Sequence, residues 1–244
     1  MSDLFCLHGF TGSPESWAFL SGSGLAWVAP ALLGHAGTSA DSTARSFEDE
    51  VERLAALMAP GRALHVVGYS LGARLALGIA LRFPERVSRL TLISGQPGLP
   101  SEAERSERRA ADARWIELLR ERGLAAFVEA WEAQPLWASQ SALPSALRAR
   151  KRAERLSHDA AGLARSLAVT GLGEMPDYAE RSRELRLPVT LLVGELDVKF
   201  CALARAMAAR FRHAELAIAP GAGHDLLLER PEFVTEVIRR GNQP

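Results

Sequence analysis

Short apolar segments alternate with amphipathic segments along most of the chain. Six segments of strand length contain continuous rather than alternating apolar residues; they cover residues 4–7, 27–29, 63–68, 90–94, 189–194 and 215–219. Four longer segments have apolar residues at helical spacing; they cover residues 47–58, 71–83, 202–211 and 231–240. Continuously apolar strands that alternate with helices are typical of a parallel sheet covered by helices on both faces. The pattern therefore predicts an α/β fold with a mostly parallel sheet.

The alternation stops between residues 96 and 186. That stretch contains no convincing strand, and its many Arg, Glu and Ala residues favour several helices. A helical insertion between two strands of such a sheet is best explained as a cap over an active site. We therefore predict a core formed by residues 1–95 and 187–244 and a helical cap formed by residues 96–186.

Length and charge narrow the function classes. The 244 residues are enough for one α/β domain with an inserted subdomain. The 29 basic residues balance the 29 acidic ones, so no overall attraction to nucleic acid or to an anionic membrane is expected. No apolar run approaches the length of a membrane-spanning helix. We expect a small-molecule partner, and the sequence leaves open whether the protein is a monomer or a homodimer.

The cysteines and the first residues bear on the cellular location. Cys6 and Cys201 are the only cysteines, and we expect both to be reduced thiols. No spacing typical of metal ligands is present, so no metal site is predicted. The chain enters its first apolar segment at Leu4, with no charged region, long apolar stretch or cleavage site before it. These features predict a cytoplasmic protein.

The Gly-Tyr-Ser-Leu-Gly motif at residues 68–72 carries the strongest chemical signal. An apolar strand leads into it and a helical segment leaves it, which is the arrangement of a nucleophile elbow. The turn is so tight that side chains two residues either side of the serine would clash, so glycines are needed there. Ser70 is therefore predicted to present its hydroxyl at the end of the sheet. Arg74 lies one helical turn further on and can face the same space.

Two later loops supply the partners that a catalytic serine needs. His224 follows Gly-Ala-Gly just after the last apolar strand, where its side chain can reach a nucleophile on a neighbouring strand. Asp197 stands just past the preceding strand and would orient the imidazole and stabilise its protonated form. Glu195 competes for this role and is the weaker candidate. The chain order Ser70, Asp197, His224 is that of the α/β-hydrolase fold.

The loop after the first strand, His8-Gly9-Phe10, has the position that contributes to an oxyanion hole in this fold. One backbone amide would come from Phe10 and the other from Leu71, the residue after the serine. His8 is predicted to brace this loop rather than to take part in chemistry. The Gly-His-Ala-Gly-Thr-Ser turn at residues 34–39 is predicted to be structural as well.

The chain resembles the α/β-hydrolase superfamily over nearly its whole length. It is more closely similar to one branch, the 2-succinyl-6-hydroxy-2,4-cyclohexadiene-1-carboxylate synthase family of menaquinone biosynthesis. The stretches that carry the resemblance are LHGFTGSPESW, VVGYSLGARLAL, GQPGL followed by ERSERRAADARW, FVEAWEAQPLWAS, GELDVKF and AGH. The Gly-Gln-Pro-Gly-Leu, Trp-x-x-Gln-Pro-Leu-Trp and Asp-x-Lys-Phe segments are the specific ones, because hydrolases in general share the elbow and the Asp and His loops.

The resemblance implies a carbon–oxygen lyase rather than a hydrolase. Such an enzyme removes pyruvate from 2-succinyl-5-enolpyruvyl-6-hydroxy-3-cyclohexene-1-carboxylate, which carries several carboxylates, and needs no cofactor. The resemblance also implies a set of substrate-binding side chains: Tyr69, Arg74, Arg108, Trp131, Arg155 and Lys199. Relative to the family pattern, the chain lacks the strands usual before the first His-Gly loop, so we expect a sheet that is shortened at its N-terminal edge.

Physical chemistry supports the cationic part of this set independently. Arginine forms bidentate pairs with carboxylates, and such pairs are stronger in a dry cleft. Arg74 and Lys199 each lie within a few residues of a predicted triad member. Arg108 and the basic segment around Arg155 have a solvated helix face as the alternative. With a polycarboxylate substrate, Ser70 would act as the proton-abstracting base rather than form an acyl enzyme.

Two other functions remain open from the sequence. A carboxylesterase or C–C bond hydrolase with the same triad would turn over activated esters such as p-nitrophenyl acetate and would have an apolar cleft. A non-catalytic binding module on this fold would have no need for all three triad residues. Release of pyruvate from the enolpyruvyl substrate would separate both alternatives from the lyase.

Overall fold

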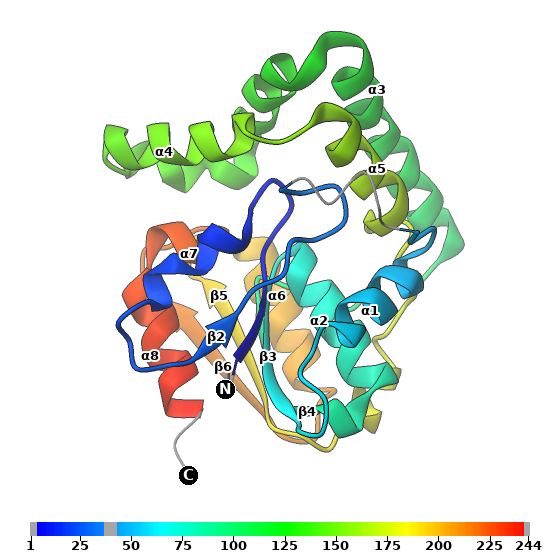
Figure 1. Ribbon diagram of the computed structural model, residues 1–244, viewed down its shortest axis with the longest axis vertical. Helices are drawn as coiled ribbons and strands as arrows, with labels where there is room; N and C mark the ends of the chain where they lie inside the picture. Colours follow the sequence, from blue (N-terminus) through cyan, green and yellow to red (C-terminus); the bar gives the residue numbers. More distant parts are fainter. Residues whose placement is uncertain (1–3, 37–42, 242–244) are drawn as a thin grey trace.

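The computed structural model describes residues 4–36 and 43–241 and is built around one six-stranded sheet. The strand order is β2-β1-β3-β4-β5-β6, and every neighbouring pair is parallel (Figure 1). The strands are β1 (Leu4–Leu7), β2 (Trp27–Val28), β3 (Leu64–Tyr69), β4 (Val87–Ile93), β5 (Val189–Gly194) and β6 (Ala214–Ala219). All six predicted strands are present, and the predicted parallel α/β fold is confirmed.

Each face of the sheet has its own apolar core. Phe5 and Val66 belong to the core on one face, and their chain neighbours Cys6 and Val67 belong to the core on the other. The first face is covered by α1 (Phe47–Ala56), α2 (Leu71–Arg82) and α6 (Val198–Ala208), and the second by η1 (Pro14–Leu20), α7 (Leu226–Glu229) and α8 (Pro231–Gly241). Successive strand residues point to opposite faces. Because both faces are buried, the strands must be apolar at consecutive positions, which explains the continuous runs in the sequence.

Two elements begin three or more residues earlier than predicted. β4 begins at Val87 rather than at residue 90, directly after the short 3-10 helix η2 (Pro84–Arg86). Its second residue, Ser88, is exposed, so the start of this strand lacks an apolar signal. α6 begins at Val198 rather than at residue 202, because the side chain of Asp197 accepts a hydrogen bond from Phe200 N and caps the helix there.

The chain between β4 and β5 is described in full and contains helices but no strand. The helices are α3 (Glu102–Glu132), η3 (Pro135–Ala142), α4 (Ser145–Leu156), α5 (Ala160–Thr170) and η4 (Arg181–Glu184). Figure 1 shows α3, α4 and α5 grouped at one end of the molecule, beyond the sheet. Leu119 and Phe127 of α3 pack with Leu163 and Leu167 of α5 in an apolar cluster separate from the two cores. No helix within the described ranges is long and apolar enough to cross a membrane.

The turn predicted at residues 34–39 is described only up to residue 36; residues 37–39 lie outside the described ranges. Gly34 has a φ of +77°, and a Cβ there would lie 2.0 Å from the carbonyl oxygen of Gly162 in α5. Glycine at position 34 therefore permits a close approach between the core and α5.

Candidate active site

Ser70 stands between β3 and α2 in a strained turn. Its φ of 52° and ψ of −107° lie outside the regions that L-residues normally occupy. A Cβ at position 68 would lie 2.2 Å from the carbonyl oxygen of Gly72, and one at position 72 would lie 2.1 Å from that of Leu7. Both positions therefore require glycine. A side chain at position 68 would clash within the turn itself, whereas one at position 72 would clash with β1. Ser70 N donates to Ile93 O at 2.8 Å, which ties the turn to β4.

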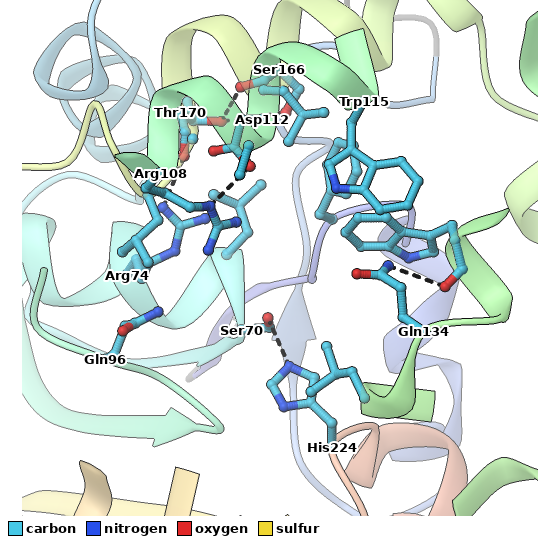
Figure 2. A pocket seen from close by; sticks show the side chains of 18 of the residues that line it. Ser70, Arg74, Gln96, Arg108, Asp112, Trp115, Gln134, Ser166, Thr170 and His224 are labelled. Atoms are coloured by element: carbon cyan, nitrogen blue, oxygen red, sulfur yellow. Dashed lines mark hydrogen bonds and ion pairs between the residues drawn. The ribbon is translucent and has the colours of Figure 1, made fainter. Parts of the chain in front are cut away.

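His224 lies between Ser70 and Asp197. Its Nε2 is 3.1 Å from Ser70 Oγ, and its Nδ1 is 2.6 Å from Asp197 Oδ2 (Figure 2 shows the contact with Ser70). A carboxylate at this distance keeps the ring proton on Nδ1, so Nε2 is left to accept the serine proton. Glu195, the competing carboxylate, is exposed and accepts a hydrogen bond from Gly221 N at 2.8 Å instead. The geometry therefore joins Ser70, His224 and Asp197 in the order that a catalytic triad needs.

The loop after β1 is held in place by a buried histidine. His8 Nε2 accepts a hydrogen bond from Leu32 N at 3.2 Å, so its Nδ1 carries the proton that is donated to Gly9 O at 2.9 Å. Burial lowers the pKa of His8 to about 4, which keeps the ring neutral at pH 7. These bonds agree with the bracing role predicted for His8. Phe10 follows in this loop. Phe10 and Leu71 both border the cavity beside Ser70 and His224, and the amide of Leu71 belongs to the first turn of α2.

A cavity of about 410 Å³ borders Ser70 and His224, and its wall combines the core with the segment between β4 and β5. Five of the predicted substrate-binding residues line it: Tyr69, Arg74, Arg108, Trp131 and Lys199. The sixth, Arg155, lines a neighbouring cavity. Its guanidinium lies 5.2 Å from the ring centre of Trp137, and that ring lies 5.6 Å from the ring of His224. The indole of Trp137 thus contacts both the guanidinium of Arg155 and the ring of His224.

Arg74 and Arg108 lie together on one wall of the cavity (Figure 2). Arg74 Nη1 donates to Thr170 O at 2.9 Å, and burial together with the nearby charge of Arg108 lowers the pKa of Arg74 to about 9. It therefore remains a cation at pH 7. Arg108 Nε donates to Asp112 Oδ1 at 2.9 Å, and burial raises the pKa of that carboxyl. Two guanidinium groups beside a single carboxylate leave positive charge facing a buried space.

The comparisons with known proteins agree with this site. Residues 4–237 match the model of the alpha/beta hydrolase family. The 2-succinyl-6-hydroxy-2,4-cyclohexadiene-1-carboxylate synthase of Salmonella paratyphi C (strain RKS4594) is 34% identical over 96% of this chain and 90% of its own length. A Bacillus subtilis (strain 168) protein provisionally assigned the same name is 38% identical over 96% of this chain and 88% of its own. The chain belongs to the 2-succinyl-6-hydroxy-2,4-cyclohexadiene-1-carboxylate synthase family.

A solved structure supports this membership of the synthase family. MenH from S. aureus superposes with a TM-score of 0.93 at 28% identity, covering 98% of this chain and 93% of that one. An esterase from Thermogutta terrifontis superposes with a TM-score of 0.84 at 24% identity, covering 98% and 89%, and shows the shared fold alone. The family resemblance expected from the sequence motifs is therefore confirmed.

Several wall residues of this synthase-family cavity are not predicted from the sequence. They include Gln96, Asp112, Trp115, Trp137 and Phe200. Gln96, Trp137 and Phe200 belong to the specific motifs, so the motifs themselves are the signal that could have identified them. Asp112 stands four residues after Arg108 on α3, a spacing that places both side chains on one helix face.

Polar groups without a partner line the same cavity. Tyr69 Oη, Asp112 Oδ2, Trp131 Nε1 and Trp137 Nε1 are buried, and none of them has a hydrogen-bond partner within the described part of the chain. A buried polar group is costly without a partner, so these groups favour a polar ligand in the cavity. Among residues 4–36 and 43–241, no group of three or more His, Cys, Asp or Glu side chains is placed to hold a metal ion.

Proposed function

We propose that the protein is a carbon–oxygen lyase that eliminates pyruvate from 2-succinyl-5-enolpyruvyl-6-hydroxy-3-cyclohexene-1-carboxylate. The product is 2-succinyl-6-hydroxy-2,4-cyclohexadiene-1-carboxylate, and the reaction belongs to menaquinone biosynthesis. Membership of the synthase family supports this reaction. The observation in the structure that carries it is the pair Arg74 and Arg108 on the cavity that also borders Ser70 and His224.

A substrate with several carboxylates fits the charge of this cavity. Arg74, Arg108 and Lys199 supply cations, and the free Tyr69 Oη and Trp131 Nε1 supply hydrogen-bond donors. Guanidinium groups in a buried site bind carboxylates through paired hydrogen bonds. An esterase that binds an uncharged acyl group has no use for such a wall. We include Arg155 in the proposed set, acting through its contact with Trp137.

The triad would move a proton rather than form an acyl enzyme. His224 accepts the hydroxyl proton of Ser70, and Asp197 stabilises the resulting imidazolium. Ser70 Oγ then takes a proton from the cyclohexene ring of the substrate. The electrons of the C2–H bond form a double bond between C2 and C3, the electrons of the existing C3=C4 double bond move to C4–C5, and the C–O bond between C5 and the enolpyruvyl group breaks. The departing enolpyruvate takes up the proton that His224 holds and becomes pyruvate, which returns the imidazole to its neutral form, so atoms and electrons balance without a redox partner.

The oxyanion hole would stabilise the charge that develops in this step. Electrons released by proton abstraction at C2 spread into the carbonyl of the succinyl group on that carbon, whose oxygen gains negative charge in the transition state. The amides of Phe10 and Leu71, both at the cavity, are proposed to donate to it. The N-terminus of α2 behind Ser70 would add a favourable dipole.

The proposal includes the domain division at residues 96 and 186, with the helical cap over the core. The separate apolar cluster of α3 and α5 supports this division. The two free, buried cysteines are compatible with the proposed cytoplasmic location. A monomer and a homodimer both remain within the proposal.

Pyruvate release tests the proposal directly. The purified protein is mixed with the enolpyruvyl substrate, and pyruvate is measured by coupling to lactate dehydrogenase and NADH. We expect turnover of this substrate and little hydrolysis of p-nitrophenyl acetate. Rapid ester hydrolysis without pyruvate release would favour the esterase. The absence of both reactions, with tight binding of the substrate, would favour a binding module.

A further inference from the structure

Glu229 holds the backbone on both sides of His224. It is the last residue of α7, it is buried, and its side chain folds back toward the start of that short helix. Its Oε2 accepts a hydrogen bond from Gly223 N at 2.7 Å, and its Oε1 accepts one from Asp225 N at 3.3 Å. The two residues that flank the histidine are therefore bound to a single carboxylate.

Ser139 reaches the same carboxylate from η3. Its Oγ donates to Glu229 Oε1 at 3.1 Å. Gly223 makes room for this contact, because a Cβ there would lie 2.0 Å from Ser139 Oγ. The same short helix carries Trp137, whose ring packs 5.6 Å from that of His224. The helix η3 thus contacts the loop around His224 through the hydrogen bond of Ser139 and through the ring of Trp137. A displacement of η3 is therefore transmitted to this loop.

The carboxylate of Glu229 is better suited to fixing backbone amides than to filling space in an apolar core. Burial, helped by the nearby charge of Asp225, raises the pKa of Glu229 above its usual value, and the hydrogen bonds from Gly223 N and Ser139 Oγ oppose this shift. A buried carboxylate is unfavourable unless hydrogen-bond donors surround it. If position 229 served packing alone, an apolar residue there would cost less free energy to bury. A carboxylate has two acceptor oxygens and can hold two peptide groups and a hydroxyl at once. This is the arrangement that fixes the loop.

We infer that Glu229 is a positioning residue for His224, and that Ser139 couples this position to η3. The imidazole is then aligned with Ser70 only when η3 is seated on the histidine loop. The kinetic part of this inference rests on the proposed lyase function and its triad. Misplacing a catalytic group by about 1 Å can lower the rate about 100-fold, so a small change in the loop is measurable.

The kinetic test uses two variants of Glu229 and one of Ser139. Glu229→Gln keeps one acceptor oxygen, whereas Glu229→Ala keeps none. We expect kcat for pyruvate release to fall about 10-fold in Glu229→Gln and about 100-fold in Glu229→Ala, with KM within about threefold. For Ser139→Ala, which removes one donor, we expect a fall in kcat of about three- to tenfold.

Matched controls exist in the same region. Glu195→Gln alters an exposed carboxylate that accepts from Gly221 N, on the same loop but away from the amides beside His224. Ser141→Ala removes a hydroxyl of η3 that donates to Ala138 O at 2.8 Å within its own segment. Both controls should keep kcat within about twofold of the wild type, because neither side chain contacts the backbone amides of Gly223 and Asp225.

A second measurement does not depend on the substrate. The ¹⁵N chemical shifts of the His224 ring, assigned by their loss in His224→Gln, report its hydrogen bonds to Asp197 and Ser70. These shifts should change in Glu229→Gln and Ser139→Ala and remain unchanged in the two controls. A residue with a merely structural role would lower Tm without moving them.

The outcomes separate this inference from the proposed function. A wild type that releases no pyruvate would contradict the lyase, and the ring shifts would then decide the role of Glu229. Unchanged kcat and unchanged shifts in Glu229→Ala, or a loss confined to KM, would overturn the inference. If the Glu229 variants do not fold, Ser139→Ala compared with Ser141→Ala decides, and equal kcat and equal shifts for these two would overturn it.

Discussion

Arg74 joins the elbow helix to the last carbonyl of a helix from the segment between β4 and β5. Its Nη1 donates to the carbonyl oxygen of Thr170, the final residue of α5, at 2.9 Å. The last carbonyls of a helix have no partner within it and carry the negative end of its dipole, so a buried cation is well placed there. One part of the guanidinium is thereby held, and Arg74 remains on the cavity wall beside Ser70.

Replacing Arg74 by lysine should lower kcat/KM for pyruvate release by about 10- to 100-fold, because lysine keeps the charge but loses the planar fork. Steady-state kinetics measure this effect, and circular dichroism checks the fold. Arg82→Lys is the matched control on the same helix, since Arg82 is an exposed partner of Glu52. Equal losses in both variants would remove Arg74 from the substrate site.

Ser70→Ala tests the base itself. If Ser70 Oγ takes the substrate proton, its removal should lower kcat by at least about 10³-fold, as loss of a triad serine does in other enzymes. Ser88→Ala, at an exposed position of β4, is the control and should keep full activity. Pyruvate release within about tenfold of the wild type in Ser70→Ala would mean that another group abstracts the proton.

Asp197→Asn tests the orientation of the imidazole. The carboxylate accepts from His224 Nδ1 at 2.6 Å, whereas an amide can donate to that nitrogen and favour the wrong tautomer. We expect kcat to fall by about 10⁴-fold with the fold intact. Glu195→Gln changes the competing carboxylate and should leave kcat within about twofold. The reverse ranking of these two variants would assign the orienting role to Glu195.

The core and the arrangement of Ser70, His224 and Asp197 could be predicted because their signals are local. Burial on both faces of the sheet makes each strand continuously apolar, so β3 and β5 stand out in the sequence. The triad residues follow strand ends, and the fold places those ends at one edge. Glycine is needed at positions 68 and 72 because a side chain there would clash with backbone that lies a few residues away or on the adjacent strand.

The walls of the cavity could not be predicted in the same way. The packing of α5 on the core decides whether Arg74 contacts Thr170. The packing of α4 decides how far Arg155 lies from the cavity. Helix periodicity gives the faces of these helices and not their positions in space. Asp112 stands in a stretch that carries the family resemblance, but its own signal is its spacing from Arg108, and a spacing of four on an exposed helix usually indicates a surface ion pair.

Gly34 is expected to limit the packing of α5 on the core. Gly34 and Gly61 both have a φ of +77°, but a Cβ at position 34 would meet Gly162 O at 2.0 Å, whereas nothing lies within 4 Å of one at position 61. Alanine at either site pays a similar backbone strain of about 1 kcal/mol, and only Gly34→Ala adds the clash. We expect Gly34→Ala to lower the free energy of unfolding by at least about 2 kcal/mol more than Gly61→Ala in urea titrations. Equal losses would show that α5 can shift without cost.

Glu154 of α4 binds the core in a way that depends on pH. Its Oε1 accepts hydrogen bonds from Ser13 Oγ at 2.7 Å and Ser16 Oγ at 2.8 Å, and its Oε2 lies 2.9 Å from Lys151 Nζ. Burial alone would raise the pKa of Glu154, but Lys151 and the two hydroxyl groups outweigh it and lower the pKa to about 2. The ionised form therefore links α4 to the region of η1.

The stabilisation by Glu154 should disappear in acid. Because the folded pKa of about 2 lies below the ordinary value of 4.5, the contribution is full above about pH 5 and is lost as the pH falls toward 2. Glu154→Gln cannot titrate, so the wild type should be more stable than this variant by about 2 kcal/mol at pH 7, with a smaller difference at pH 3. Urea unfolding at a series of pH values measures the difference. A difference that stays constant from pH 7 to pH 3 would mean that the carboxylate is not ionised in this contact, and that α4 is held to the core by packing alone.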